Sequence, residues 1–287
     1  MGLENLIKKV YTKLNNKEKR ENLEKLVSEF WKITSDKSAP TIEFIWVDKE
    51  VQNYYNYLDK NINNFDLADA AQLTGNEPLY KIIAGDYIEN LKFGLFSSAL
   101  INKKIKEDDK IKIITPTPIN YLFYKLENAE AYVNRVGDYL GYKSKNSKIY
   151  AEEAEKYSGY MMENCELHVK KAGPLLGYNS KNSKIYAGEA GDYAGEGIDG
   201  CELHLKEAGK RLGSDAKNSR IYAEEAGDGA GYYMENSELF IYKLNGSLAY
   251  SCLEVNNKIY LGEESYKKFI RKYPKYIGKV KLWEKQN

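Results

Sequence analysis

Apolar and polar residues repeat at a fixed interval through the second half of the chain. The sequence Asn-Ser-Lys-Ile-Tyr starts at Asn146 and again at Asn182, and Asn-Ser-Arg-Ile-Tyr starts at Asn218, a step of 182 − 146 = 36 residues. Related segments start halfway between, at Asn164 and Gly200, so the true period is 18 residues. A fixed period without insertions is typical of a solenoid, in which each repeat forms one coil.

Each coil contains a stretch in which apolar and polar residues alternate. When the positions of a coil are counted from Asn128, positions 2, 4 and 6 carry small or apolar residues in successive coils. Position 4 is the most regular of them, with Ala131, Ile149, Leu167, Ile185, Leu203, Ile221 and Leu239. A period of two indicates a strand with one buried face, so the pattern predicts one strand per coil and a narrow apolar interior.

Glycine recurs at two further positions of the coil. Position 10 carries Gly173, Gly191, Gly209 and Gly227, and position 14 carries Gly141, Gly159, Gly177, Gly195, Gly213 and Gly231. Glycine at a fixed corner permits a positive φ or a close approach of neighbouring backbones. In a helical repeat each glycine would cost about 1 kcal/mol. The pattern therefore favours an α+β chain whose main part, residues 110–262, is a parallel β-helix of 18-residue coils, and disfavours a helical repeat.

Charged residues change sign from one coil to the next. Position 3 alternates between acid and base through Glu130, Lys148, Glu166, Lys184, Glu202, Arg220 and Glu238. Equivalent positions of neighbouring coils lie about 4.8 Å apart in a solenoid. Opposite charges at that spacing attract, whereas a slip of one coil would bring like charges together. We interpret the alternation as a device that fixes the register.

Asparagine dominates position 1 of the coil. Its members Asn146, Asn164, Asn182, Asn218 and Asn236 are predicted to stack at one corner, and Gly200 interrupts them. Stacked asparagine side chains form hydrogen-bonded ladders in cross-β structures. We therefore expect these residues to be structural.

The glycine-rich segments resemble those of one known β-helix family. Residues 190–198 (Ala-Gly-Asp-Tyr-Ala-Gly-Glu-Gly-Ile), followed by Cys-Glu-Leu-His-Leu at 201–205, are similar to the coil of that family, and residues 226–231 and 136–141 repeat the motif. The family includes the C-terminal domain of the glutamate synthase large subunit and one of the subunits of formylmethanofuran dehydrogenase. The resemblance covers about residues 128–262 and implies a right-handed β-helix that acts as a structural spacer or scaffold and supplies no catalytic residues. The coils of this chain are slightly shorter, and Asn or Cys replaces some of the family's glycines.

The residues before the coils, 1–109, predict a helix-rich region with at least one strand. The expected elements are two amphipathic helices in residues 1–33, a strand from Thr41 to Val47, a helix from Val51 to Ile62, and one or two helices between Glu77 and Ile101. Ile111 to Ile114 is expected to start a degenerate first coil. We interpret the region either as a cap on the solenoid or as an independent docking domain.

The residues after the coils, 263–287, are interpreted as a C-terminal cap. Asn257 to Leu261 predicts the last strand, and Glu263 to Lys272 predicts a short helix that ends before Pro274. A solenoid needs cover on its terminal coils, because exposed strand edges associate with one another.

Composition and charge narrow the range of partners. Lys plus Arg number 43 and Asp plus Glu 42, a net charge of +1, whereas proteins that bind phosphate-rich polymers or anionic membranes usually carry a basic excess. The first residues lack the order of a signal peptide, and no apolar stretch approaches the roughly 18 residues that cross a bilayer. We therefore expect a cytoplasmic protein that binds neither nucleic acid nor membrane.

Two Cys-x-x-His segments, Cys165 to His168 and Cys201 to His204, are candidate zinc ligands. Residues three apart on a strand point to opposite faces, and the two segments are two coils, or about 9.6 Å, apart. Both considerations disfavour a shared tetrahedral ion, so no metal, cofactor or catalytic residue is expected. A set of acidic residues is likewise interpreted as solvated surface charge rather than as acid–base pairs: Glu152, Glu153, Glu189, Glu224 and Glu225.

An aromatic column at position 5 is the candidate for partner binding. Its members are Tyr132, Tyr150, His168, Tyr186, His204, Tyr222 and Phe240, of which the six from Tyr150 onward are the proposed binding face. A second outward column is expected from Tyr142, Tyr160, Tyr178, Tyr232 and Tyr250. The aromatic columns are interpreted either as stacks that stiffen the solenoid or as a flat surface for a protein partner, because tyrosine is enriched in interfaces.

These features predict a non-enzymatic β-solenoid that serves as a scaffold or protein-interaction module with a protein partner. The first alternative is an accessory structural subunit of a larger redox or amidotransferase-like enzyme complex. The second is a carbohydrate-active hydrolase or lyase, although β-helices of that class form their clefts from long loops and these coils contain none.

Overall fold

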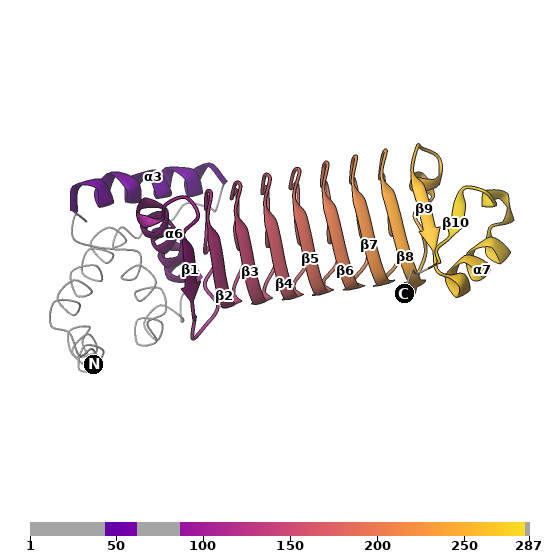
Figure 1. The fold of residues 1–287 in the computed structure, drawn as a ribbon, viewed down its shortest axis with the longest axis horizontal. Coiled ribbons are helices and arrows are strands. Elements are labelled where there is room, and N and C mark those ends of the chain that lie inside the picture. Colours follow the sequence, from indigo (N-terminus) through magenta and orange to yellow (C-terminus); the bar gives the residue numbers. More distant parts are fainter. Residues whose placement is uncertain (1–43, 62–86, 285–287) are drawn as a thin grey trace.

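A computed structural model describes residues 44–61 and 87–284 of the chain. The described residues form an elongated body in which ten strands stand side by side in chain order, with helices at both ends (Figure 1). Neighbouring strands pair in parallel along the whole sheet. The predicted parallel β-solenoid of 18-residue coils is confirmed, whereas its right-handedness stays a prediction from the family resemblance.

The regular strands are seven residues long, and each begins 18 residues after the previous one. They are β2 (Glu130–Val136), β3 (Lys148–Ala154), β4 (Glu166–Ala172), β5 (Lys184–Ala190), β6 (Glu202–Ala208), β7 (Arg220–Ala226) and β8 (Glu238–Leu244). The outer strands are shorter, namely β1 (Lys110–Ile113), β9 (Lys258–Leu261) and β10 (Val280–Leu282). Tyr132 pairs with Tyr150 and Ile149 with Leu167, so equivalent positions lie over one another as the repeat predicts.

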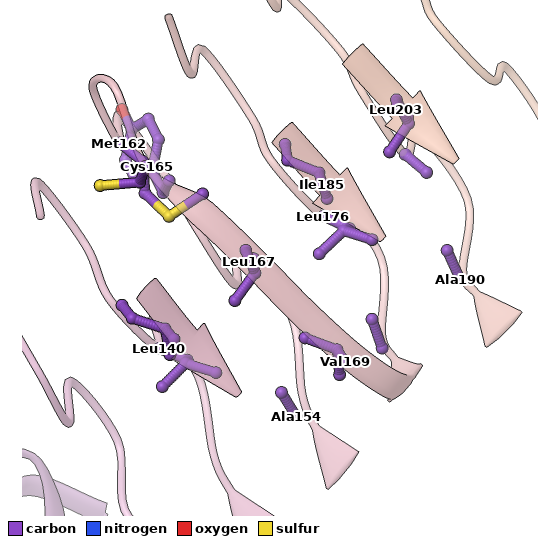
Figure 2. Packing of buried hydrophobic residues seen from close by; sticks show 14 of the residues in the cluster. Leu140, Ala154, Met162, Cys165, Leu167, Val169, Leu176, Ile185, Ala190 and Leu203 are labelled. Carbon is purple, nitrogen blue, oxygen red and sulfur yellow. The ribbon is translucent and has the colours of Figure 1, made fainter. Parts of the chain in front are cut away.

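The core runs along the whole solenoid and has two sources. On the strand side, positions 4, 6 and 9 of each coil contribute Leu167, Val169 and their equivalents. On the opposite side, positions 13 and 17 of the coil contribute Leu140, Leu176 and Met162 (Figure 2). The strand pattern does not assign positions 13 and 17 to the core, because they belong to a segment without strand periodicity.

Left-handed backbone conformations bend the chain on the side away from the strands. Position 14 is glycine with φ between +64° and +75° from Gly141 to Gly231, as the glycine column predicts. Non-glycine residues adopt a positive φ at positions 12, 16 and 1, for example Tyr157 at +60° and Met161 at +53°. The glycines at position 10 act by close approach, since a Cβ on Gly191 would lie 2.6 Å from the backbone nitrogen of Pro174 in the previous coil.

The N-terminal flank contains α3 (Phe44–Asn61) and α6 (Tyr87–Lys104). The predicted strand from Thr41 to Val47 is wrong where the structure describes it, because residues from Phe44 onward are helical. Val47, Val51, Tyr54 and Leu58 are all buried at a helical spacing, which extends the predicted helical stripe by one turn toward the N-terminus.

Two parts of the N-terminal prediction lie outside the described residues. These are the helices expected in residues 1–33 and the segment 77–86. Ile111 to Ile114 does start a first, shortened coil, since β1 pairs with β2.

Helix α6 covers the open end of the first coil through polar contacts to its backbone. Ser98 Oγ donates a hydrogen bond to the carbonyl oxygen of Tyr121 at 2.9 Å, and Asn102 Nδ2 donates to that of Tyr124 at 2.8 Å. A Cβ on Gly94 would overlap the carbonyl oxygen of Asn120, so only glycine permits this close approach. In the described part of the chain, no further coil precedes β1 to accept hydrogen bonds from or donate them to this end of the solenoid. Helix α6 therefore supplies the donors for carbonyl groups of the first coil.

The C-terminal flank contains α7 (Glu263–Lys272) between β9 and β10, with the 3₁₀ turns Tyr250–Leu253 and Pro274–Tyr276. The prediction that Asn257 to Leu261 is the last strand is wrong, because β10 pairs with β9 through Val280 and Ile259. A three-residue strand after a helix and a turn carries too little alternation to be recognised in the sequence. The predicted helix in α7 is confirmed.

Candidate functional site

The aromatic residues at position 5 form one continuous stack along the sheet. Neighbouring ring centroids lie 4.4–5.1 Å apart with interplanar angles of 16° or less. The stack contains Tyr132, Tyr150, His168, Tyr186, His204, Tyr222, Phe240 and Tyr260. The predicted column does not include Tyr260, although Asn256 to Tyr260 (Asn-Asn-Lys-Ile-Tyr) differs from the Asn-Ser-Lys-Ile-Tyr motif at one residue and follows after an insertion of two residues.

Stacking determines which part of each ring a ligand can reach. The faces of Tyr150 to Phe240 are covered by the rings of the neighbouring coils, and each ring is only half-buried, so its edge points outward. Sugars and nucleic-acid bases bind aromatic residues through ring faces. The stack therefore presents a row of ring edges and hydroxyl groups, not a set of stacking platforms.

A long trough lies beside the aromatic stack. It has a volume of about 1220 Å³ and is lined by positions 5, 6 and 7 of strands β2 to β7. Position 5 supplies one wall as the aromatic stack, and position 6, whose side chains point into the core, forms the floor between the walls. Position 7 supplies the opposite wall with Asn134, Glu152, Lys170, Gly188, Lys206 and Glu224. The strand pattern predicts the outward aromatic wall, but it does not show how much open space lies between that wall and the side chains at position 7.

The side chains at position 6 lie beneath the trough and point into the core. Val169, Leu205, Ala151 and Ala223 are buried there, and Ala187 is half-buried. Gly188 follows Ala187, whereas a glutamate follows Ala151 and Ala223.

The trough ends at the side chain of Trp283, which follows β10. The indole lies edge to face against Phe240, with centroids 5.7 Å apart, and against Tyr242, at 6.3 Å. These two rings occupy positions 5 and 7 of β8 and flank Ile241, whose side chain is fully buried. Trp283 thus lines the end of the trough beside the last regular coil. Nothing in the repeat pattern assigns it there.

The Cys-x-x-His segments separate across the sheet as the strand geometry predicts. Cys165 and Cys201 are buried in the core, whereas His168 and His204 stand in the aromatic stack. Burial raises the pKa of the Cys165 thiol to about 11, which disfavours the thiolate that zinc requires. Among residues 44–61 and 87–284, no three His, Cys, Asp or Glu side chains are placed to hold a metal ion.

Each histidine of the stack is hydrogen-bonded to the acid two residues before it. His168 Nε2 lies 2.6 Å from Glu166, and His204 Nε2 lies 2.7 Å from Glu202. The imidazole of His168, together with Lys148, outweighs burial and holds the pKa of Glu166 below its usual value. In the coils of β4 and β6, therefore, the imidazole nitrogen of the ring beside the trough already has a glutamate as its hydrogen-bond partner.

The acidic residues considered as acid–base pairs mostly pair with bases of the adjacent coil. Glu152 lies 3.0 Å from Lys170, Glu189 lies 3.3 Å from Lys171, and Glu153 lies 3.0 Å from Arg135. Glu225 pairs with Lys243 at 2.9 Å. These ion pairs agree with the interpretation of the acids as surface charge that links coils.

The asparagine column occupies a corner where the backbone is left-handed. Asn146, Asn164, Asn182, Asn218 and Asn236 have φ between +48° and +53°. One amide–amide hydrogen bond is present in the described part of the column, from Asn146 to Asn128 at 3.2 Å, and Asn218 donates to Asp199 instead. The preference of asparagine for left-handed φ is thus the better account of this column than a continuous ladder.

The second tyrosine column is not outward along its whole length, which corrects the prediction. Tyr142 and Tyr160 are 1% and 6% exposed, and Tyr142 packs against Tyr124 with centroids 5.3 Å apart. Helix α3 reaches the same place through Asp48, which binds Lys125 and Lys143 at 2.7 Å each and accepts a hydrogen bond from the Tyr124 hydroxyl. Helix α3, far away in the sequence, thus docks beside Tyr124, which packs on Tyr142, whereas Tyr160 packs between Tyr142 and Tyr178 of the neighbouring coils. The repeat pattern could not reveal the contribution of the helix.

Comparisons with known proteins add no relative to this picture. No protein-family model, curated protein or solved structure matches the chain. The resemblance to the glycine-rich β-helix family therefore rests on the motif residues alone. No helix in the described residues is long and apolar enough to cross a bilayer.

Proposed function

We propose that this protein is a non-enzymatic scaffold that binds a protein partner along the trough. The observation that carries the proposal is the trough itself: about 1220 Å³ of open, largely apolar groove along strands β2 to β7, edged by ring edges on one side and by charged side chains of both signs on the other. Apolar grooves with aromatic walls and a charged rim are typical of sites that bind polypeptide segments.

The same geometry weighs against the carbohydrate alternative. Sugar-binding aromatic residues need a free ring face, and the faces along the stack are covered by neighbouring rings. The accessory-subunit alternative remains compatible with the proposal, because a partner bound in the trough would be the enzyme subunit in that case.

Site-specific photocrosslinking in native extract tests the proposal. A benzophenone amino acid replaces Lys206 on the trough wall or, as a matched control, Lys181 at position 18, an exposed lysine that does not line the trough. We expect one protein adduct with the Lys206 variant and none with the Lys181 variant. Adducts of equal yield from both positions, or none from Lys206, would contradict the proposal.

The identity of the crosslinked protein separates the two remaining roles. A catalytic subunit would favour the accessory-subunit role, and a protein without catalytic activity would favour the independent scaffold.

A further inference from the structure

Positive charge is concentrated in the C-terminal cap. Residues 263–284 contain seven basic and three acidic residues, a net charge of +4, whereas the whole chain carries +1. They lie at the end of the rod opposite helices α3 and α6 (Figure 1). All seven basic side chains are exposed, namely Lys267, Lys268, Arg271, Lys272, Lys275, Lys279 and Lys281. The charge balance that disfavours binding to an anionic membrane therefore does not hold at this end of the molecule.

The bases of the cap also differ from those of the solenoid in their partners. Many bases of the solenoid pair with an acid of the adjacent coil, as Lys145 does with Glu163 at 2.9 Å. In the cap, Lys267 pairs with Glu263 one helical turn away. Within residues 44–61 and 87–284, no ion pair joins the other six basic side chains to an acid. These charges are available to a partner outside the described chain.

Helix α7 holds part of this charge on one face. Ser265 and Phe269 are buried on its inner face, at a helical spacing, against the end of the solenoid. The outer face carries Lys267, Lys268, Arg271 and Lys272. Since the apolar face of the helix is already covered by its own chain, the helix contacts a partner through its charges.

A protruding turn presents an apolar side chain beside these bases. Ile277 (φ −56°, ψ 129°) and Gly278 (φ +87°) form the centre of a type II turn. A 3.0 Å hydrogen bond from the Lys279 nitrogen to the carbonyl oxygen of Tyr276 closes the turn. Ile277 is 62% exposed, and a Cβ on Gly278 would have no other atom within 4 Å. The turn therefore projects an isoleucine into solvent between Lys275 and Lys279.

The aromatic rings of the cap are used within the protein. Tyr250 packs against Tyr273 and Tyr276, with ring centroids 5.5 and 6.0 Å apart. Lys272 stands over the ring of Tyr273 at 5.2 Å, and Lys275 stands over that of Tyr276 at 4.7 Å. Single-stranded nucleic acids bind by stacking bases on open ring faces beside basic residues. The cap has the bases but engages these ring faces itself.

A bilayer uses both the charges and the aliphatic tip. Lysine and arginine side chains bind anionic headgroups, and an aliphatic side chain enters the boundary between headgroups and acyl chains. The flexible stems of lysine let the ammonium groups stay in water while a neighbouring apolar side chain is buried. A nucleic acid gives no use to Ile277, and an acidic protein would need a pocket matched to it.

We infer that the C-terminal cap binds the surface of an anionic phospholipid bilayer. Lys268, Arg271, Lys275 and Lys279 contact the headgroups, and Ile277 enters the boundary beneath them. The inference does not depend on the proposed function. A rod attached by its end keeps the trough along strands β2 to β7 accessible to a protein partner.

Co-sedimentation of the full chain with lipid vesicles tests the inference. One set of vesicles contains phosphatidylcholine only, and the other contains about 30% phosphatidylserine. We expect binding to the anionic vesicles to be at least about tenfold tighter than to the neutral ones. Raising the salt to about 0.5 M should weaken it several-fold, because the charges of the cap are exposed and therefore screened.

Two variants separate the charges from the apolar tip. The triple variant Lys268→Gln, Lys275→Gln, Lys279→Gln should weaken binding to the anionic vesicles at least about tenfold. Ile277→Ser should weaken it about fivefold and leave the salt dependence intact. All four positions are exposed, so the melting temperature should stay near that of the wild type.

Matched controls change exposed residues outside the cap. The triple variant Lys181→Gln, Lys184→Gln, Lys210→Gln removes the same number of charges from the solenoid, where these lysines form no ion pair with a described residue. Ile114→Ser changes an isoleucine that is 65% exposed near the other end of the solenoid. Both controls should bind vesicles like the wild type.

Several results would overturn the inference. These are equal binding to the two kinds of vesicle, binding unchanged in both cap variants, or equal losses in the cap and control variants. Displacement of the protein from vesicles by duplex DNA or polyglutamate at the same concentration of negative charge would assign the cap to a nucleic acid or an acidic protein instead. The Lys206 crosslink reports on the trough independently of each of these results.

Discussion

At the scale of single residues, the coil depends on left-handed backbone at side chains other than glycine. At position 16, Asn179 and Gly197 suit a positive φ, whereas Met161 adopts +53° with its side chain 41% exposed. A left-handed conformation costs an ordinary L-residue roughly 1–2 kcal/mol, and asparagine less.

Met161→Asn should therefore stabilise the protein, by up to about 1 kcal/mol. Thermal unfolding followed by circular dichroism measures the effect, and the reverse change, Asn179→Met, is the matched control, which should lower the melting temperature. A lower melting temperature for Met161→Asn would show that the methionine side chain makes contacts that outweigh its backbone strain.

A second residue-scale prediction concerns glycine inside a helix. Alanine normally stabilises a helix interior by about 1 kcal/mol relative to glycine. Gly94→Ala should do the opposite, because its Cβ would overlap the carbonyl oxygen of Asn120 and push α6 off the first coil. Hydrogen exchange should then quicken in α6 and β1.

Ser97→Ala on the same helix is the control for this prediction. Its buried Oγ has no hydrogen-bond partner in the described residues, so the substitution should leave stability unchanged or slightly higher. Stability gained by Gly94→Ala would mean that α6 does not lie as close to Asn120 as the structure shows.

At the scale of the strands, the alternating charges are partly realised as ion pairs. Arg220 lies 3.0 Å from Glu238, and Lys148 lies 3.3 Å from Glu166. Lys184 lies in register between Glu166 and Glu202, but both acids are hydrogen-bonded to histidines and it forms no ion pair with a described residue.

Arg220→Glu should lower the melting temperature by a few degrees at low salt, because it removes an ion pair and places three acids in adjacent coils. Lys184→Glu should have a smaller effect, since it removes no direct pair. Raising the salt to about 1 M, where the Debye length is about 3 Å, should reverse most of the loss for both. A loss that salt does not reverse would point to packing, not charge.

The strand scale also shows what the sequence can predict. Every coil repeats the same alternation of apolar and polar residues, so the assignment of a position to the core can be checked in seven coils. Ile149, Leu167 and Ile185 could therefore be placed in the core from the sequence. The segment from Thr41 has no such repetition, and its β-branched and aromatic residues suggested a strand in place of a helix. Local composition alone could not decide between the two.

At the scale of the whole molecule, one cluster joins the N-terminal helices to the solenoid. Asp48 of α3 binds Tyr124, Lys125 and Lys143. Burial raises the pKa of Asp48, but the hydrogen bonds from these three residues outweigh burial and hold it well below its usual range. A carboxyl with a lowered pKa stabilises the folded state above its ordinary pKa, and that contribution is lost as the pH falls through the folded value.

Asp48→Asn should therefore be less stable than the wild type at pH 7, and the difference should shrink as the pH falls below about 4. Other carboxyl groups affect both proteins equally, so the difference in melting temperature isolates Asp48. Hydrogen exchange of residues 44–61 identifies the docked helix as the affected part. A difference that stays constant down to pH 2 would exclude titration of this carboxyl as its cause.

Much of the candidate site could not be predicted at this scale. The outward column from Tyr150 to Phe240 follows from the repeat, but the open space beside it does not, and the end of the trough depends on Trp283, which returns after helix α7 and a 3₁₀ turn. The burial of Tyr142 depends on a helix that is remote in the sequence. The periodicity of the sequence does not predict contacts between segments that are far apart in the chain.

Because the charge pattern has twice the period of the backbone, the rod can be shortened without conflict only in pairs of coils. Excising residues 182–217 would set Glu166 beside Arg220 and keep every opposite-charge neighbour. Excising residues 182–199 alone would set Glu166 directly beside Glu202, with the same backbone closure and the opposite electrostatics. The shorter excision should give the less thermostable product despite retaining more of the chain, so length in this architecture comes in even units.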